Sequence, residues 1–340
     1  MIASTRIDGI LGPGICLADG EYQITKPLGQ GGFGITYRGT DTRLNRPVAI
    51  KEFFPEGCWR EGSSVVSAGK WNLTTYRSAK QKFLQEGRTL GQFNHTGIVK
   101  VFHYFEENNT AYMVMEYLQG KTLTEKLKER GGRLKEAEAL YYIAKIGQAL
   151  EVLHQARFLH RDIKPSNIML ADDERVVLID FGAARDFTSH NFKKFTAMVT
   201  PGYAPLEQYG RALQHGSFTD VYALGATLYH LLTGSVPISA VERAAGVELK
   251  EARQLNSQIS PHVSQAISKA MVMNIEQRSQ SVREFLELLD RDLCQPLPKT
   301  KTPKIHFYHS VRDPWSAFAT STIASTPGIK TTRNSEDRWF

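Results

Sequence analysis

The sequence predicts an α+β protein in which the first third of the chain is mainly β and the remainder is mainly helical. Short runs rich in β-branched and aromatic residues occur up to about residue 115, for example 22–28 and 111–115. Longer segments with apolar residues at helical spacing follow, notably 134–154 and 221–232. With 340 residues, 41% of them hydrophobic and 23% charged, the chain suffices for one large two-lobed domain or two small ones.

A glycine-rich run, Leu28-Gly29-Gln30-Gly31-Gly32-Phe33-Gly34, is the first motif of the chain. The GxGxxG pattern alone is a weak indication, and a dinucleotide-binding turn would need a helix directly after it. The run Ile35-Thr36-Tyr37 follows instead, and its β-branched and aromatic residues favour a strand. We therefore expect the glycines in a hairpin between two strands.

The stretch from Phe158 to Arg185 carries polar residues on an apolar frame. Two apolar runs, 168–170 and 176–179, flank the turn-forming residues 171–174, which predicts a hairpin. Asp162 and Asn167 precede the first run and Asp180 follows the second, so the hairpin should bring Asn167 and Asp180 together. Such oxygen ligands suit Mg²⁺, which takes its remaining ligands from water and phosphates. The stretch therefore points to phosphoryl transfer.

His160-Arg161-Asp162, four residues and Asn167, followed by Asp180-Phe181-Gly182, resembles the catalytic and metal-binding loops of the eukaryotic-like (Hanks-type) serine/threonine protein kinases. A polar loop that carries Asp and Asn only as turn formers is the alternative. The resemblance covers about residues 21–293 and implies a bilobal protein-kinase fold, with a small, mainly β lobe over about 21–116 and a larger, mainly α lobe over about 119–293. It implies transfer of the γ-phosphoryl of MgATP to protein Ser/Thr, with Mn²⁺ as a substitute metal.

The resemblance also implies roles for single residues. Asp162 would accept the substrate hydroxyl proton, Lys164 would steady the transferred phosphoryl charge, and Asn167 and Asp180 would hold Mg²⁺. The strand Val48-Ala49-Ile50-Lys51 matches the VAIK motif of the family, so Lys51 would contact the α- and β-phosphates rather than be a solvated surface charge.

Lys51 needs a carboxylate partner, and the predicted helix 75–93 offers Glu86. Phe83, Leu90 and Phe93 have helical spacing, and Glu86 shares their inward face, where a carboxylate is costly unless paired. A solvated Glu86 at the edge of that face is the alternative. The insertion 52–74 lengthens the separation of Lys51 and Glu86. Its start, with KEFFP after VAIK, resembles a bacterial subset of the family, but the sequence gives the insertion no role.

An ATP pocket follows from the same resemblance. Met115 stands behind a hinge, Glu116 to Gly120, that would meet adenine through backbone groups, and Thr36 replaces the usual Val with a near-isosteric side chain. The predicted ATP-binding residues are Leu28, Gly29, Gly31, Gly32, Phe33, Gly34, Thr36, Ala49, Lys51, Met115, Glu116, Leu118 and Met169.

The run from Thr200 to Glu207 resembles the end of a kinase activation segment, although Pro205-Leu206 replaces the Ala-Pro of the APE motif. The resemblance implies that Thr200 bonds the catalytic Asp and Lys and that Arg278 pairs with Glu207. Asp220 begins the apolar segment that ends at Leu232. It is expected to bond the backbone of the His-Arg-Asp loop, to act as the helix N-cap, or to do both.

Activation by phosphorylation is a further expectation. In the family an Arg before the catalytic Asp receives a phosphate from the activation segment, and Arg161 holds that place. Thr188, Ser189 and Thr196 are the candidate acceptors. The alternative is that Arg161 only packs against the loop.

Composition limits the partners. The net charge is +7, but +4 of it lies from Pro296 onward, where there are seven Lys/Arg and three Asp/Glu. The residues before Pro296 carry only +3, so no basic face for nucleic acid is expected on them. The 3 cysteines form no CxxC pair, which favours a reducing compartment such as the cytoplasm. The longest apolar helix candidate, 221–232, is too short for a membrane span.

Around the kinase-like region we expect an irregular leader over 1–20 and a Ser/Thr-rich, basic, disordered tail over 294–340. Protein substrates are the expected partners, and autophosphorylation would involve self-association. A pseudokinase that binds ATP as a scaffold is the rival interpretation. The presence of every phosphoryl-transfer residue argues against it.

Overall fold

The computed structural model describes residues 9–32, 34–67, 71–181, 199–210 and 214–290, together with the backbone of 185–186. Residues 1–295 form one compact unit and residues 296–340 a second. The predicted tail over 294–340 lies outside the described residues.

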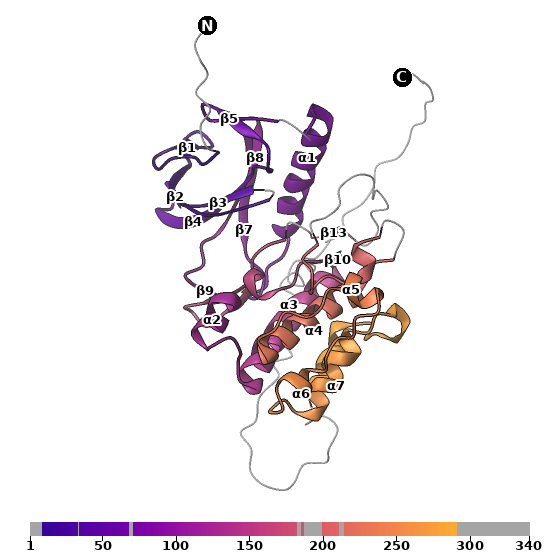
Figure 1. Ribbon diagram of the computed structural model, residues 1–340. Coiled ribbons are helices and arrows are strands. Elements are labelled where there is room, and N and C mark those ends of the chain that lie inside the picture. Colours follow the sequence, from indigo (N-terminus) through magenta and orange to yellow (C-terminus); the bar gives the residue numbers. More distant parts are fainter. Residues whose placement is uncertain are drawn as a thin grey trace, which may run out of the picture. The chain divides into compact units, whose positions relative to one another are not determined.

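A curled antiparallel sheet of six strands forms the body of the small lobe (Figure 1). Residues that face the interior of the sheet alternate with more accessible ones along β3, as a strand with one buried face requires. The strand order is β1 (Cys16–Leu17), β2 (Tyr22–Gly31), β3 (Gly34–Asp41), β4 (Arg46–Phe53), β8 (Thr110–Glu116), β7 (Val101–Glu107). The glycine run therefore lies in the hairpin between β2 and β3, as predicted.

The prediction of an irregular leader over 1–20 is wrong for its last part. Residues 16–17 form the edge strand β1 and pair with β2. The reason is burial, because the side chains of Leu11 and Leu17 are only 4% and 0% exposed and contribute to the core of the lobe. Gly14, at a φ of 87°, lets the chain turn between these two leucines.

A hairpin and a helix complete the small lobe. The hairpin consists of β5 (Trp59–Glu61) and β6 (Ser64–Val66), and the helix is α1 (Leu73–Leu90). The helix predicted over 75–93 begins and ends earlier. It begins at Leu73 because the Asn72 side chain caps it by accepting a hydrogen bond from the Thr75 N–H at 2.9 Å, and it ends at Leu90, before Gly91. Its buried face packs against β7 and β8 so closely that Gly87 leaves little room for a Cβ atom.

The large lobe is mainly helical, with α4 in its interior and a small sheet of β9, β11 and β12 at its start (Figure 1). Its helices are α2 (Leu123–Glu129), α3 (Glu136–Gln155), α4 (Ser217–Thr233), α5 (Ala240–Ala244), α6 (Ala252–Leu255), α7 (Pro261–Ala270) and α8 (Val282–Leu289). Its strands are β9 (Gly120–Thr122), β10 (Phe158–Leu159), β11 (Ile168–Ala171), β12 (Val176–Leu178) and β13 (Arg185–Asp186). Within the described ranges, none of the helices is both long and apolar enough to span a bilayer.

Helices α2 and α8 of the large lobe begin at side-chain caps. Thr122 and Glu125 form a full capping box at α2. At α8 only half of a capping box exists. Ser281 accepts a hydrogen bond from the Glu284 N–H, but the Glu284 carboxylate accepts from the backbone of Gln280 instead of Ser281.

Candidate active site

Lys51 lies between two carboxylates. Its Nζ is 2.7 Å from Oδ1 of Asp180 and 3.9 Å from Oε1 of Glu86. Burial works to lower the pKa of Lys51, but Asp180 and Glu86 outweigh it and raise the pKa above its ordinary value. The structure therefore places Glu86 inward beside Lys51, on the face of α1 that carries Phe83, and not in solvent at the edge.

The hairpin predicted after Asn167 is present. Strands β11 and β12 pair with Ile168 opposite Leu178, and the Ile179 N–H donates to the Asn167 carbonyl at 3.1 Å. Asn167 and Asp180 therefore flank one end of the hairpin. The Asn167 amide nitrogen donates to Oδ2 of Asp162 at 2.8 Å, and its amide oxygen accepts from the Ser166 hydroxyl at 3.5 Å, a long bond that a metal ion would replace. An amide oxygen and a carboxylate are hard donors, so these residues fit Mg²⁺.

A compact network holds the side chain of Asp162. Thr200 Oγ1 donates to Oδ1 of Asp162 at 2.7 Å, and Lys164 Nζ lies 2.8 Å from Oδ2. Lys164 Nζ also donates to Thr200 Oγ1 at 2.8 Å. Both carboxylate oxygens are thus oriented by neighbours, as the sequence predicted for Thr200.

Asp220 accepts hydrogen bonds from the backbone of the loop that carries His160 and Arg161. Its Oδ1 accepts from the Arg161 N–H at 2.8 Å, and its Oδ2 accepts from the His160 N–H at 2.9 Å and lies 2.8 Å from His154 Nε2. Burial works to raise the pKa of Asp220, but the bond to His154 and neighbouring groups lower it below the ordinary value. These bonds hold Arg161 at a φ of 65°, a strained conformation for a residue with a side chain.

Of the two roles expected for Asp220, the N-cap is wrong. Helix α4 begins at Ser217, and its cap residue is Gly216, so Asp220 lies in the first turn. Asp220 lies beyond the N-cap position from which a side chain reaches the first N–H groups of its own helix, and it accepts from the N–H groups of His160 and Arg161 instead.

Glu207 and Arg278 form a buried ion pair. Nη1 of Arg278 is 2.6 Å from Oε1 of Glu207, and Nη2 is 3.3 Å from Oε2. Thr219 also donates to this carboxylate, at 3.2 Å. The adjacent Gln208 side chain donates to the Arg161 carbonyl at 2.9 Å. Pro205-Leu206 therefore leaves Glu207 in the expected pairing, while Thr219 and Gln208 are contacts that sequence reasoning missed.

Comparison with known proteins agrees with this arrangement. The family model described as the protein kinase domain matches residues 22–294. The chain belongs to the protein kinase family. Its fold is the bilobal kinase fold, and a solved structure described as the PpkA-294 apo form matches it with a TM-score of 0.72 at 33% identity, covering 83% of this chain and 100% of the other.

Curated bacterial relatives are serine/threonine kinases. One is the serine/threonine-protein kinase PknA of Nostoc sp., 33% identical over 80% of this chain and 47% of its own length. Another is serine/threonine-protein kinase B of Synechocystis sp., 30% identical over 80% of this chain and 46% of its own. A third is PknA of Mycobacterium tuberculosis, 31% identical over 79% of this chain and 60% of its own. The chain thus matches only part of the length of each.

Several of the residues predicted for the kinase ATP pocket lie on the strands around Lys51. Thr36 pairs with Lys51 across β3 and β4, and Ala49 pairs with Met115 across β4 and β8. Gly29 and Gly31 have open space where a Cβ would stand, so no packing inside the lobe requires glycine there. This openness is what a close approach by phosphates would use. Gly34 differs, because a Cβ would lie 2.3 Å from the Glu52 carbonyl.

The hinge of the kinase fold carries a contact that the sequence did not indicate. Arg175, in the turn between β11 and β12, donates from Nη1 to both carboxylate oxygens of Glu116, at 2.7 and 3.0 Å. The ion pair of Glu116 and Arg175 therefore joins the end of β8 to the large lobe.

Three other residues predicted to bind ATP lie outside β3, β4 and β8. Leu118 is buried, whereas Leu28 is 45% exposed. Met169, on β11, pairs with Thr122 on β9.

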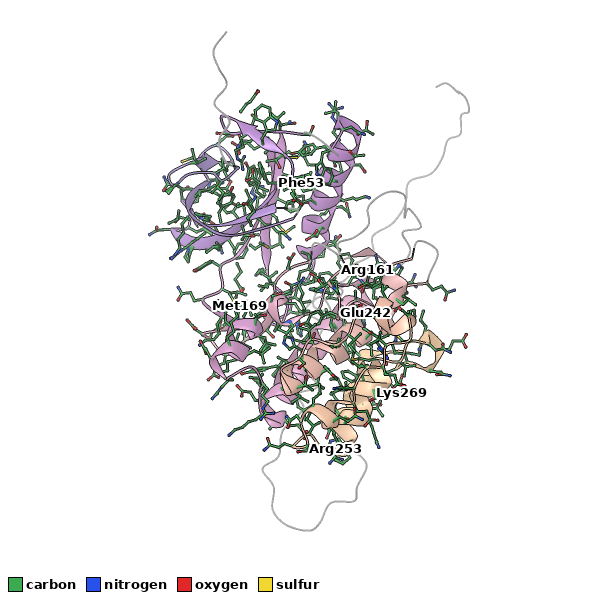
Figure 2. All side chains as sticks on the ribbon, in the orientation of Figure 1. Phe53, Arg161, Met169, Glu242, Arg253 and Lys269 are labelled. Carbon is green, nitrogen blue, oxygen red and sulfur yellow. The ribbon has the colours of Figure 1, made fainter. Side chains whose placement is uncertain are left out.

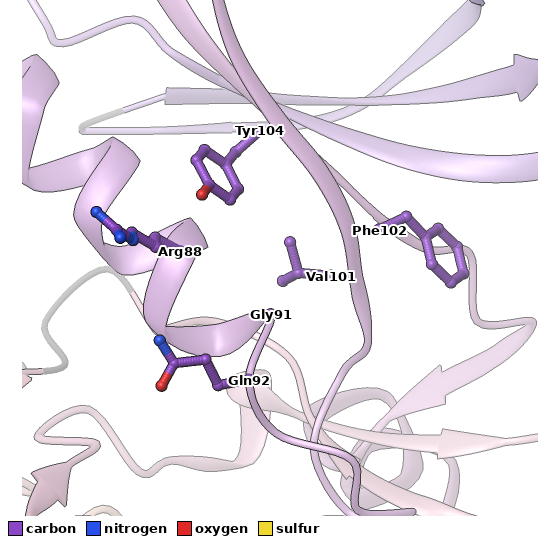
Figure 3. Close-up of a pocket in the computed structure, with 6 residues that line it drawn as sticks. All are labelled: Arg88, Gly91, Gln92, Val101, Phe102 and Tyr104. Atoms are coloured by element: carbon purple, nitrogen blue, oxygen red, sulfur yellow. The ribbon is translucent and has the colours of Figure 1, made fainter. Parts of the chain in front are cut away.

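A pocket of about 340 Å³ opens at a different place, between the end of α1 and β7 (Figure 3). Its lining residues are Arg88, Gly91, Gln92, Val101, Phe102 and Tyr104. None of them is among the residues predicted to bind ATP.

Several predicted residues lie outside the described ranges. They are Phe33, Gly182, Thr188, Ser189 and Thr196. The phosphorylation switch that would act on Arg161 therefore stays a prediction. The backbone of β13 pairs with β10, whose two residues directly precede His160. The described start of the activation segment therefore runs beside the strand that leads into the catalytic loop.

Proposed function

We propose that this chain is a serine/threonine protein kinase that transfers the γ-phosphoryl of ATP to hydroxyl groups of protein substrates. The observation that carries the proposal is the network around Asp162, in which Thr200, Lys164 and Asn167 hold both carboxylate oxygens. The names of the bacterial relatives support the same activity. Lys164 in the Asp-x-Lys-x-x-Asn pattern favours Ser/Thr over Tyr as acceptor.

Asp162 would orient the substrate hydroxyl and accept its proton. General base catalysis needs a carboxylate within hydrogen-bond reach of that hydroxyl, and the donors on Asp162 fix the direction in which it can accept. Lys164, 2.8 Å from Asp162, places a positive charge where the transferred phosphoryl group would pass. The arrangement positions groups and stabilises charge, which is most of what phosphoryl transfer requires of a protein.

Lys51, Asn167 and Asp180 would hold the phosphate end of the nucleotide. Asn167 and Asp180 are the residues that would bind Mg²⁺, or Mn²⁺ in its place, and the bound metal would neutralise phosphate charge. Lys51 lies 2.7 Å from Asp180 and 3.9 Å from Glu86, and these contacts would orient its ammonium group for the α- and β-phosphates.

The rival, an ATP-binding pseudokinase scaffold, has no described residue in its favour. The protein substrates, self-association for autophosphorylation and a cytoplasmic location stay predictions.

The test replaces Asp180 by Ala and measures phosphate transfer from ATP to a generic protein substrate. The matched control is Asp172→Ala, because Asp172 is an exposed carboxylate in the turn before β12. We expect the Asp180 variant to lose at least about two orders of magnitude in kcat and the control to retain its rate. Near-parental transfer by a purified Asp180→Ala protein would refute the proposed mechanism.

A further inference from the structure

The insertion after Lys51 contains a fully buried ion pair beside the catalytic lysine. Glu52 follows Lys51 on β4, and because side chains alternate along a strand it faces the interior of the curled sheet. Arg60, on β5, contacts the Glu52 carboxylate through Nη2, and the two side chains are 1% and 0% exposed. A buried charge is costly unless paired, so each residue depends on the other.

Two tyrosines complete the pairing of the carboxylate. The Tyr37 hydroxyl donates to Oε2 of Glu52 at 2.9 Å, and the Tyr112 hydroxyl donates to Oε1 at 3.0 Å. Burial works to lower the pKa of Arg60, but the contact with Glu52 outweighs it and raises the pKa. A buried polar network with its partners in place rigidifies the structure around it.

The other two nitrogens of Arg60 donate hydrogen bonds to the backbone of two further segments. Nε donates to the Gly9 carbonyl at 2.7 Å, and Nη1 donates to the Ser63 carbonyl at 2.9 Å. The Leu11 N–H donates to the Tyr37 hydroxyl at 3.1 Å. The stretch before β1 and the hairpin of β5 and β6 are therefore tied to the end of β4 through this one pair.

The same end of β4 contacts helix α1. Phe53, directly after Glu52, packs against Tyr76 and Phe83 of α1 with ring centroids 5.4 and 5.8 Å apart. Figure 2 shows Phe53 between the sheet and the helix. Phe83 lies one helical turn before Glu86, so a shift of Phe53 would move the face of α1 that carries Glu86.

The turn between β7 and β8 provides a second connection between the hairpin of β5 and β6 and helix α1. The Asn109 side chain donates to the Val65 carbonyl on β6 at 2.7 Å, and the Tyr76 hydroxyl of α1 donates to the Asn109 carbonyl at 3.0 Å. The Val65 N–H donates to the Asn108 carbonyl at 2.8 Å. The turn between β7 and β8 thus joins the hairpin to the first turns of α1.

We propose that Glu52 and Arg60 are positioning residues that hold α1 so that Glu86 stays within reach of Lys51. The contact of Lys51 with Glu86, at 3.9 Å, is longer than that with Asp180, at 2.7 Å, so it is the one that a small movement of the helix breaks first. The inference rests on the proposed kinase activity, and it gives the insertion 52–74 a role in that reaction.

The test removes both charges at once in Glu52→Gln/Arg60→Met, which avoids leaving one charge buried alone. The control is Arg46→Met, because Arg46 pairs with Asp41 at the opposite end of β4, at 3.1 Å. Hydrogen exchange of the α1 amides, which needs no catalytic activity, should be faster in the double variant and unchanged in the control.

Kinetics then test whether the pair acts through Glu86. We expect kcat/KM of the double variant to fall about tenfold, and Glu86→Gln to cost less in that background than in the parent protein. In the Arg46→Met background the cost of Glu86→Gln should be the same as in the parent. An inactive parent protein would refute the kinase proposal, whereas an equal cost of Glu86→Gln in the double variant would overturn the positioning role.

A milder variant of the same network decides the matter if the double variant does not fold. Tyr112→Phe removes the hydroxyl that donates to Oε1 of Glu52 and keeps the aromatic ring. Tyr229→Phe is the control, because the Tyr229 hydroxyl donates to the Lys250 carbonyl at 3.1 Å in the large lobe. Faster exchange in α1 of the Tyr112 variant alone supports the proposal, and equal exchange in both variants overturns it.

Discussion

Thr200 is a single residue that connects the activation segment to the catalytic loop. Its hydroxyl donates to Asp162 and accepts from Lys164, at 2.7 and 2.8 Å, so it fixes the two groups relative to each other. A hydroxyl can do both because it is a donor and an acceptor at once. The role of Thr200 in the proposed kinase is therefore positional.

Replacement of Thr200 by Val keeps its shape and removes the hydroxyl. We expect kcat to fall at least about tenfold, because Asp162 loses a donor that orients it, while Thr200→Ser keeps most of the activity. Steady-state kinetics of both variants provide the measurement. Equal rates for the Val and Ser variants would show that the hydroxyl has no part in the reaction.

At the scale of elements, the contact of α4 with the catalytic loop depends on Asp220. A buried carboxylate with its pKa held below the ordinary value adds stability at pH above its unfolded value, and this stability is lost as the pH falls through the lowered folded pKa. Asp220→Asn should reduce the free energy of unfolding by about 3 kcal/mol at pH 7.

The difference in unfolding free energy between the parent and the Asp220→Asn protein should shrink as the pH falls below about 4, where the unfolded carboxyl becomes protonated. Urea unfolding at a series of pH values measures it. A difference that stays constant down to the acid limit of folding would mean that the charge of Asp220 is not what stabilises the loop.

Elements with a local signal could be predicted from the sequence, and those that depend on distant partners could not. The capping box of Thr122 and Glu125 lies within four consecutive residues. The hairpin after Asn167 follows from two apolar runs and the turn between them. Strand β1 was missed because its burial depends on β2. The pairing of Glu52 with Arg60 was missed because only the curled sheet brings these residues together in an apolar interior.

The candidate site shows the same division. Lys51, Glu86 and Asp162 were found through motifs and helical spacing, and the structure brings Lys51 and Glu86 to 3.9 Å. The contacts of Gln208 with the Arg161 carbonyl and of Arg175 with Glu116 carry no such signal, because they join segments far apart in the chain.

At the scale of the whole molecule, the match to the protein kinase domain ends at residue 294. No residue from Pro296 onward matches a catalytic motif. A chain that ends at Gln295 should therefore keep the kcat of the full-length protein. Loss of activity on this truncation would show that the tail, with Phe307, Trp315 or Phe318 as candidate anchors, takes part in catalysis.

In the proposed kinase, the network around Asp162 serves phosphoryl transfer and does not merely shape an ATP-binding scaffold. The most direct measurement compares kcat and the Kd for MgATP in the parent and in Asp162→Asn. We expect kcat to fall by about 10²-fold or more with little change in Kd, because the contacts of Asp162 are with Thr200, Lys164 and Asn167. An unchanged kcat in the Asp162→Asn protein would contradict the account.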